Sequence, residues 1–226
     1  MKNKAFLDIL GVPMENYQGL VEKLIDEGYL KTPDIIRAFQ HVGRAGFLPD
    51  EKKEDAAVNA PLPIGYGQTI SQPLTVAFML ELLQPKKGER VLDVGYGSGW
   101  QTALLSTLVG PQGFVVAIER VRPVADFGRH NVEVFGCTNV TFVVGDGTRG
   151  YKKSAPYDKI IVAAGAEEIP QALLEQLAVP GRLVIPVGRH EHDMVKIDRE
   201  GKKDFTEERF PGFQFVPLIS SEWGSE

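Results

Sequence analysis

The chain is poor in cysteine and has no long apolar run, and each absence excludes a class of protein. Its single cysteine, Cys137, cannot form an internal disulfide. No apolar stretch approaches the roughly 20 residues that a membrane-spanning helix needs. Asp8 interrupts the short apolar stretch near the start, which is therefore unlike a signal peptide. We expect a cytoplasmic protein with no membrane partner.

The balance of charges does not favour nucleic acid. Lys and Arg number 25 against 30 Asp and Glu, the formal net charge is −5, and no long basic run occurs. Phosphate binding needs clustered Lys and Arg, so we expect no nucleic-acid partner. A length of 226 residues suffices for one α/β domain with an extension, or for two small domains.

Strand-like and helix-like segments alternate through most of the chain. Short apolar runs predict strands, and apolar residues at helical spacing predict the helices between them. The predicted strands cover 90–95, 113–119, 139–146, 157–165 and 181–188, and the predicted helices begin near 73 and cover 98–108, 121–135 and 170–178. Such alternation predicts an α/β fold with a doubly wound, mostly parallel Rossmann-like sheet.

The N-terminal part departs from this pattern. Residues 16–43 read as two helices, with Thr32 as the N-cap and Pro33 as the first residue of the second helix. The charged segment "PDEKKED" (49–55) reads as a solvated loop. We expect residues 1–60 to form a helical extension packed on the main domain.

The C-terminal part of the main domain, which we expect to cover 61–226, also changes character. "DMVKID" (193–198) and "DFTEERF" (204–210) flank "REGKK", which predicts an antiparallel hairpin at the sheet edge. "FQFVPLI" (213–219) predicts a last strand.

The sharpest local pattern is "VLDVGYGSGW" (91–100), in which a strand ends at Asp93 and three alternating glycines precede a helix. Gly95, Gly97 and Gly99 let the chain turn sharply and let a ligand approach the backbone. Loops at the carboxyl ends of parallel strands are where such sheets bind ligands.

Two acidic residues end the next two predicted strands. Glu119 can accept hydrogen bonds from both hydroxyls of a ribose, and Asp146 can accept one from the exocyclic amine of an adenine. The three strand ends together predict a nucleoside site. The alternative is that the glycines form only a tight turn and that the acids are solvated.

The spacing favours S-adenosylmethionine over other nucleotides. A dinucleotide site usually has G-x-G-x-x-G, whereas this loop has G-x-G-x-G, and no lysine follows as it does in a P-loop. S-adenosylmethionine has a ribose and an adenine without phosphate, and its ammonium group can meet Asp93 or nearby carbonyls. NAD is the alternative cofactor.

The segment "PLPIGYGQTISQP" (61–73) has prolines and glycines typical of a loop. Together with "VLDVGYGSGWQTALLS", "AIER", "NVTFVVGDG", "YDKIIVAAGAEEIPQALLEQL", "GRLVIPVG" and "FVPL", it resembles the protein-L-isoaspartate (D-aspartate) O-methyltransferase family over residues 15–219. The resemblance implies a class I methyltransferase fold, S-adenosyl-L-methionine as donor and S-adenosyl-L-homocysteine as product. It implies L-isoaspartyl residues of damaged proteins and peptides as acceptors, with D-aspartyl residues as further acceptors.

The resemblance also implies which residues form the site. The family's active-site serine maps onto Ser71. The implied cofactor-binding residues are Ile70, Gln72, Asp93, Gly95, Gly97, Ser98, Gly99, Glu119, Arg120, Asp146 and Gly147. The implied substrate-binding residues are Gly65, Gly67 and Thr69.

Four positions and the tail depart from the family pattern. Ala57 and Asn59 stand where the family often has tyrosine and aspartate, and Tyr96 replaces the usual threonine or cysteine between the first two glycines. Trp100 stands where tyrosine is common, and the tail after "FVPL" is short and unlike that of the family. Because the first two positions concern the acceptor, a related enzyme acting on another carboxylate, such as a normal aspartyl peptide or a small acid, is the alternative. A non-catalytic cofactor-binding module is a third hypothesis.

A carboxylate acceptor needs no general base, because its usual pKa of about 4 leaves it ionised at neutral pH. The four histidines, His41, His130, His190 and His192, lie outside the two motif loops, in agreement with such an acceptor. We read "RHEHD" as a polar loop, with a metal site as the alternative, and we expect no metal. We also expect a monomer.

The segment "GYGQTIS" is expected to form a lid or floor beside the transferred methyl group. The Ser71 hydroxyl would orient the acceptor carboxylate through a hydrogen bond, and backbone amides near Gly65 and Gly67 would add donors. The alternative role for Ser71 is to cap the helix that begins near Pro73.

Overall fold

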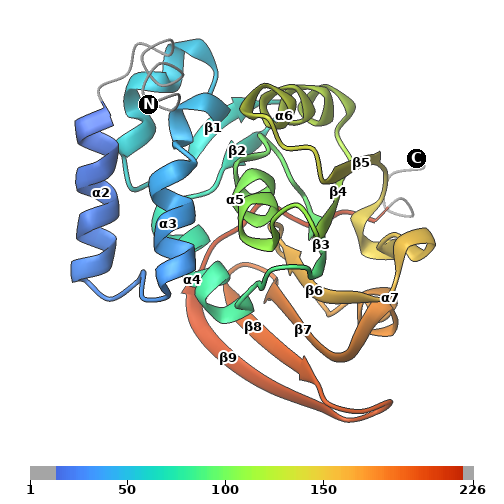
Figure 1. Ribbon diagram of the computed structural model, residues 1–226. Coiled ribbons are helices and arrows are strands. Elements are labelled where there is room, and N and C mark those ends of the chain that lie inside the picture. Colours follow the sequence, from blue (N-terminus) through green and yellow to red (C-terminus); the bar gives the residue numbers. More distant parts are fainter. Residues whose placement is uncertain (1–13, 221–226) are drawn as a thin grey trace.

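The computed structural model describes residues 14–220 and has a central seven-stranded sheet in the order β5-β4-β3-β6-β7-β8-β9 (Figure 1). The strands are β3 Arg90–Val94, β4 Phe114–Glu119, β5 Val140–Val144, β6 Tyr157–Val162, β7 Leu177–Val187, β8 His192–Arg199 and β9 Phe205–Phe213. The pairs from β5 to β7 are parallel, whereas β8 and β9 add antiparallel strands at one edge. This confirms the predicted mostly parallel sheet with antiparallel C-terminal strands.

The central strands β3 and β4 are buried on both faces of the sheet: successive residues point to opposite sides, and both sets pack against other elements. Val91 and Val115 pack with α4 and α5 on one face, whereas Leu92 and Val116 pack with α7 on the other. The helices of this part are α4 Pro73–Leu83, α5 Trp100–Val109, α6 Arg122–Phe135 and α7 Gln171–Gln176, with short 3-10 helices η4 Gly147–Arg149 and η5 Lys152–Ser154. The doubly wound arrangement is therefore confirmed.

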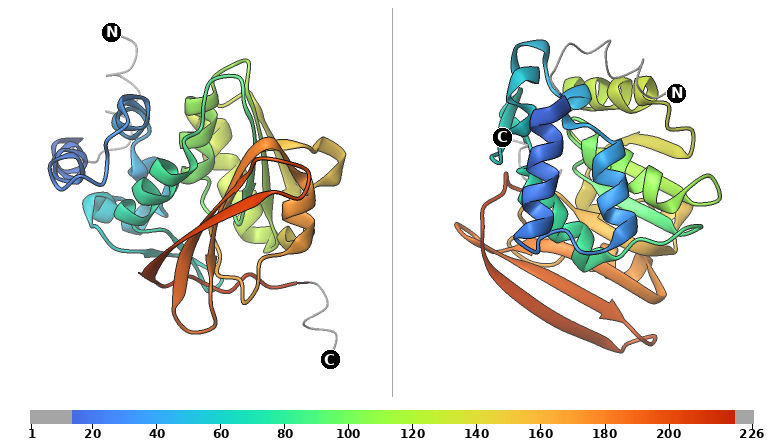
Figure 2. Two further views of the ribbon diagram at one scale, coloured as in Figure 1. Left: turned by 90° about the horizontal axis from the view of Figure 1, so that it is seen from below. Right: turned by 60° about the vertical axis from the view of Figure 1, so that its left-hand side comes forward.

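The two predicted N-terminal helices are also confirmed. Helices α2 (Met14–Asp26) and α3 (Pro33–His41) form an outer layer beyond α4 and α5, away from the sheet (Figure 2). Leu24 and Phe39 are fully buried, and the rings of Phe39 and Trp100 meet edge-on with centroids 5.5 Å apart. These helices thus share their apolar core with the first turn of α5.

The prediction that Thr32 is the N-cap of the second helix and Pro33 its first residue is confirmed, although the Thr32 hydroxyl donates to Glu81 of α4 instead of capping α3. Another local prediction near the N-terminus is wrong. The segment predicted as a solvated loop forms a 3-10 helix, η3 (Asp50–Ala57), which follows η2 (Arg44–Phe47). The sequence around Asp8, predicted not to be a signal peptide, lies outside the described residues.

Residues 61–73, predicted as a loop, form a small hairpin. Strands β1 (Leu62–Gly65) and β2 (Gln68–Ile70) pair antiparallel. The turn residues 65–67 all have positive φ, which is the conformation that tight hairpin turns require and that glycine adopts readily. The exposed ring of Tyr66 lies at the tip.

At the C-terminal end, the hairpin of β8 and β9 confirms the predicted antiparallel pair, but the last predicted strand is wrong. Residues 214–219 make only an isolated bridge, in which Gly165 N donates to Val216 O and Leu218 N donates to Gly165 O. The bridge is centred on Pro217 and uses only the groups of its two neighbours, and no adjacent residue pair extends it into a strand. Among residues 14–220, no helix has the length and apolar character needed to cross a membrane.

Candidate functional site

A cavity lies at the carboxyl ends of β3 and β4, where the glycine loop, the β1–β2 hairpin and the chain after β9 meet. It is lined by Gln68, Thr69, Ile70, Ser71, Val76, Val94, Gly95, Tyr96, Gly97, Ser98, Trp100, Gln101, Ile118, Glu119, Arg120, Val121, Gly145, Gly147, Ala163, Ala164 and the segment 216–219. The predicted site residues among these are Thr69, Ile70, Ser71, Gly95, Gly97, Ser98, Glu119, Arg120 and Gly147. Open α/β sheets bind their ligands at this edge.

The three alternating glycines give the loop its shape. Gly95, Gly97 and Gly99 have φ values of 79°, 53° and 87°, a region that side-chain-bearing residues rarely adopt. A Cβ on Gly99 would overlap the side chain of Val132 and the carbonyl of Gly128 in α6. Gly99 therefore lets the loop pack on α6, and it does so outside the cavity lining.

Glu119, which is 7% exposed, uses most of its acceptor capacity on the backbone around it. Its Oε1 accepts the N–H groups of Arg120 at 2.7 Å and Val121 at 2.9 Å, and its Oε2 accepts the N–H of Gly97 at 3.1 Å. A carboxylate has about four acceptor positions. One position on Oε2 therefore remains for a ligand hydroxyl, and a second ribose hydroxyl would have to displace the Gly97 N–H.

Asp93 lies below the loop and does not line the cavity. It is fully buried, and its two oxygens accept hydrogen bonds from Gln101 Nε2 at 2.9 Å and Thr102 Oγ1 at 2.6 Å. Burial raises the pKa of Asp93 to about 6, although the two hydrogen bonds act in the opposite direction. Gln101 does line the cavity. Asp93 therefore acts on the cavity indirectly, by holding the side chain of Gln101.

At the end of β5, the cavity is lined by backbone rather than by the predicted acid. The Oδ1 of Asp146 accepts the N–H and the hydroxyl of Thr148, at 2.9 and 2.6 Å, and its Oδ2 lies 3.6 Å from Arg149 Nε. Gly147 lines the cavity, and a Cβ there would overlap the Val94 side chain. Glycine is thus needed for the close approach of this turn to β3.

Ser71 lines the cavity between β2 and α4, and it does not cap α4. The N-cap residue is Gln72, without a capping side chain, and the amide oxygen of Asn59 accepts the N–H of Leu74 at 3.1 Å instead. The backbone carbonyl of Ser71 accepts a hydrogen bond from Arg44 Nη2 at 3.0 Å.

The remaining predicted residues lie outside the lining. The side-chain amide of Gln72 donates to the backbone carbonyl of Asn59 at 3.1 Å, and Gly65 and Gly67 belong to the hairpin turn. Ala57 ends η3 and does not line the cavity either. Of the two departures from the family pattern, Asn59 supports the segment that follows Ser71 through its contacts with Gln72 and Leu74.

A second cavity, of about 630 Å³, shares the wall formed by residues 217–219. Glu167, Arg189 and His190 contribute to it, and so does His192, which is only 6% exposed and begins β8. The prediction of a polar loop is therefore wrong for His192, because its ring packs edge-on near Phe215. The described side chains contain no group of three or more histidine, cysteine, aspartate or glutamate residues that could hold a metal ion.

Several lining residues were not predicted as site residues. The clearest are Gln68, Trp100, Gln101 and the segment 216–219. Trp100 and Gln101 directly follow the glycine loop, and residues 216–218 belong to the "FVPL" motif (215–218), so both signals were in the sequence.

Known proteins resemble this chain over most of its length. A family model for protein-L-isoaspartate(D-aspartate) O-methyltransferase matches residues 15–223. The protein-L-isoaspartate O-methyltransferase of Methanopyrus kandleri is 45% identical over 205 residues, which are 90% of this chain and 91% of that relative. That of Ignicoccus hospitalis is 44% identical over 210 residues, which are 92% of this chain and 99% of that relative.

Solved structures agree with these matches. A protein-L-isoaspartate O-methyltransferase aligns with a TM-score of 0.81 and 29% identity, over 90% of this chain and 66% of that one. A Plasmodium falciparum protein assigned to the same enzyme and solved with S-adenosyl-L-homocysteine aligns with a TM-score of 0.79 and 26% identity, over 90% of this chain and 98% of that one. Since the family model also covers residues 15–223, the chain belongs to the protein-L-isoaspartate (D-aspartate) O-methyltransferase family.

Proposed function

We propose that Ser71 directs the free carboxylate of an L-isoaspartyl residue toward the methyl group of S-adenosylmethionine, held at the ends of β3, β4 and β5. As a member of its family, the chain is a methyltransferase that depends on this donor and forms S-adenosyl-L-homocysteine. Esterification starts repair, because the methyl ester closes to a succinimide whose hydrolysis restores some normal aspartate.

The residues at the strand ends fit an adenosyl group. Glu119 has one open acceptor position for a ribose hydroxyl, and its charge favours a cationic ligand. The backbone of 95–99 and Gly147 lets a ligand lie close to the main chain. When bound, S-adenosylmethionine supplies a methyl group on a positively charged sulfur. We assign Ile70, Ser98 and Arg120 to the walls around it.

The acceptor side needs orientation rather than a base. An acceptor carboxylate with a pKa of about 4 is an anion at neutral pH, and none of the residues lining the cavity is a histidine. Ser71 and Thr69 line the cavity and carry hydroxyls, to which we assign the hydrogen bonds that orient the acceptor. Fixing an acceptor in line with the methyl group can contribute up to roughly 7–11 kcal/mol.

The second cavity gives the flanking chain of a peptide a place to lie. It shares residues 217–219 with the first cavity, so a chain running from the acceptor carboxylate could enter it. An isoaspartyl residue differs from aspartate in where its carboxylate sits relative to the chain. A site that fixes both the flanking chain and the carboxylate therefore separates the two isomers.

The observation that carries this proposal is that Ser71 faces the same cavity as the glycine loop and Glu119. Tritium-methyl transfer should be measured on paired isoaspartyl and aspartyl peptides, with parent and Ser71→Ala. We expect transfer to the isoaspartyl peptide only, and a kcat about tenfold or more lower for S71A, as loss of one hydrogen bond to a charged group implies. Failure to methylate either peptide, in a protein that binds S-adenosyl-L-homocysteine, would refute the proposal.

No contact favours an acceptor of another class, because neither Ala57 nor Asn59 lines the cavity. We also propose that the chain acts as a cytoplasmic monomer. The division into a helical extension (1–60) and a methyltransferase domain (61–226) is likewise a proposal. Light scattering of the purified protein tests the monomer.

A further inference from the structure

Arg44 is a fully buried cation next to the segment that carries Ser71. No described carboxylate forms an ion pair with it. Burial lowers the pKa of Arg44 to about 10, which still leaves the guanidinium charged at neutral pH. A buried charge without a counterion is costly unless its donors are used.

The two terminal nitrogens of Arg44 donate to backbone carbonyls from two segments, whereas its buried Nε has no hydrogen-bond partner among the described residues. Nη1 donates to Val58 O at 2.8 Å, and Nη2 donates to Ala60 O at 2.8 Å and to Ser71 O at 3.0 Å. Two longer contacts of 3.5 Å reach Ala56 O and Ile70 O. The first segment enters the β1–β2 hairpin and the second leaves it, so one guanidinium joins the two ends of the hairpin at its base.

The same guanidinium also lies beside the cofactor part of the cavity. Its central carbon is 5.6 Å from the ring centre of Trp100, the first residue of α5 after the glycine loop. The indole N–H of Trp100 donates to Val42 O at 3.1 Å, which holds the ring in place. Arg44 therefore contacts both the segment that bears Ser71 and the residue that follows the donor-binding loop.

We propose that Arg44 is a positioning residue for methyl transfer, which fixes the Ile70–Ser71 backbone relative to the glycine loop and so sets where the Ser71 hydroxyl points. This inference rests on the role proposed above for Ser71. It requires the planar fork of an arginine, because a lysine ammonium is a single point with three donors and cannot reach carbonyls spread over two segments.

The test compares Arg44→Lys with a matched arginine remote from the cavity. Arg199 also spends its guanidinium on carbonyls, those of Leu174, Leu177, Gly201 and Lys202. R199K should lose stability while its folded fraction keeps the parent kcat. In R44K, the folded fraction should lose about tenfold to a hundredfold in kcat toward an isoaspartyl peptide, as a misplacement near 1 Å implies, with S-adenosyl-L-homocysteine affinity close to that of the parent. A folded R44K with the parent kcat would overturn the proposal.

The role of Ser71 and that of Arg44 can fail separately. If S71A keeps the parent kcat, the proposed role of Ser71 fails and this inference fails with it. If S71A is slow, Arg44 should act through it, so adding R44K to S71A should cost far less than R44K costs in the parent. If R44K lowers kcat by the same factor in the parent and in S71A, the positioning role of Arg44 is overturned while the role of Ser71 stands.

A second variant and a local readout cover the case in which R44K folds poorly. Arg44→Gln keeps two N–H donors on a shorter, neutral side chain, and amide hydrogen exchange can be read on the peptide covering 68–72 in R44K, R44Q and R199K. Faster exchange there in either Arg44 variant, but not in R199K, supports the positioning role. Unchanged exchange in that peptide contradicts it.

Discussion

At Glu119, the number of open acceptor positions decides what the side chain can bind. In Glu119→Gln, one oxygen can still accept from Arg120 and Val121, but the new amide faces the N–H of Gly97, and two donors then oppose each other. We expect E119Q to bind S-adenosyl-L-homocysteine about 10- to 100-fold more weakly, as loss of a hydrogen bond to a charged group implies. Isothermal titration calorimetry measures this.

A glutamate on the protein surface provides the control for E119Q. Glu133 pairs with Arg129 on the exposed side of α6, at 2.7 Å. Glu133→Gln should bind S-adenosyl-L-homocysteine as the parent does. Equal affinities of E119Q and E133Q would show that Glu119 does not contact the nucleoside.

Asp93 should make the stability of the protein fall as pH rises. Burial raises its pKa to about 6, above the usual value of about 3.9, so the folded state holds the proton more tightly than the unfolded state does. This favourable contribution is complete below about pH 4 and is lost as pH rises through about 6. Asp93→Asn does not titrate, so its free energy of unfolding relative to the parent should increase by roughly 3 kcal/mol from pH 4 to pH 7.

Urea unfolding at a series of pH values tests this prediction. Asp126→Asn, at an exposed position of α6, is the control and should differ from the parent by a small and nearly constant amount. A difference between D93N and the parent that does not change with pH would contradict a raised pKa at Asp93.

At the scale of elements, the contact between α6 and the glycine loop depends on Gly128. A Cβ at this position would overlap Gly97 O and lie 3.0 Å from Tyr96 Cε2. Helix propensity alone predicts that alanine stabilises α6 by up to about 1 kcal/mol, whereas the contact predicts a loss of roughly 1–3 kcal/mol. We expect Gly128→Ala to be less stable and to bind S-adenosyl-L-homocysteine more weakly, because the loop must shift.

The matched control for G128A is Gly19 in α2. No atom lies within 4 Å of a Cβ built on Gly19, so Gly19→Ala should gain up to about 1 kcal/mol from propensity. Thermal unfolding of both variants separates the gain from helix propensity from the loss caused by the steric overlap at position 128. Titration calorimetry measures the accompanying change in S-adenosyl-L-homocysteine affinity. A gain in stability in G128A similar to that in G19A would contradict the close contact between α6 and the glycine loop at Gly128.

The sequence predicted the elements whose pattern is local. Short apolar runs placed all the strands of the parallel sheet to within a few residues, because a strand that is buried on both faces is apolar along most of its length. The hairpin at 61–73 was read as a loop because glycine and proline mark turns and strand ends alike. The strand predicted at 213–219 failed because its apolar residues meet the cavity wall and Gly165 rather than a partner strand.

The site was predicted less completely, because contacts distant in sequence decide it. Ser71 and Glu119 face the cavity as their motifs suggest. Asp93 and Gln72 lie in equally clear motifs, but neighbouring polar groups that no pattern reveals take up their side chains. Arg44 could not be predicted from the sequence. Its partners are backbone carbonyls beyond η3, and nothing in "VGRAGF" indicates them.

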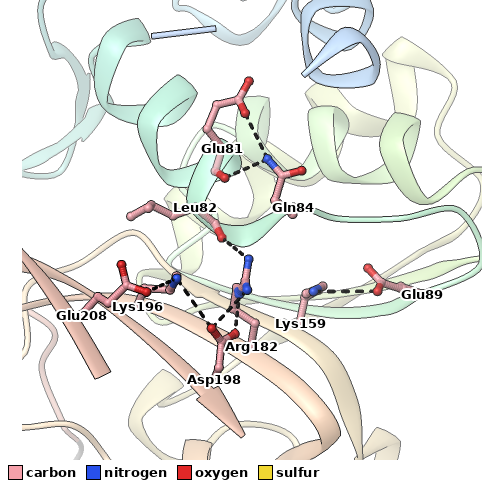
Figure 3. A network of polar contacts seen from close by, with 9 residues as sticks. All are labelled: Glu81, Leu82, Gln84, Glu89, Lys159, Arg182, Lys196, Asp198 and Glu208. Carbon is pink, nitrogen blue, oxygen red and sulfur yellow. Dashed lines mark hydrogen bonds and ion pairs between the residues drawn. The ribbon is translucent and has the colours of Figure 1, made fainter. Parts of the chain in front are cut away.

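For the whole molecule, one polar network joins the antiparallel edge of the sheet to the end of α4 (Figure 3). Arg182 of β7 binds both oxygens of Asp198 in β8, at 2.5 and 3.1 Å, and donates to Leu82 O at 2.8 Å across 100 positions of sequence. Lys196 lies 3.6 Å from Asp198 and also pairs with Glu208 of β9. The network thus ties three strands to a helix, away from the cavity.

Replacing Arg182 should therefore destabilise this edge of the sheet and leave methyl transfer unchanged. In Arg182→Met, the Leu82 carbonyl loses its partner and Asp198 keeps only Lys196 in a half-buried site, so we expect a loss of roughly 1–3 kcal/mol in the free energy of unfolding. Burial alone would raise the pKa of Asp198, but the hydrogen bond and charge of Arg182, with Lys196, outweigh it and lower that pKa. A lowered pKa gives stability that is present above about pH 4 and lost as pH falls further.

The difference between R182M and the parent should consequently be largest near neutral pH and shrink in acid. Urea unfolding at about pH 7 and about pH 3 measures it. Arg122→Met, which breaks an exposed pair with Asp126 in α6, is the control and should cost no more than about 0.5 kcal/mol. A loss in R182M that matches R122M, or that stays the same in acid, would mean that the sheet edge is held by apolar packing alone.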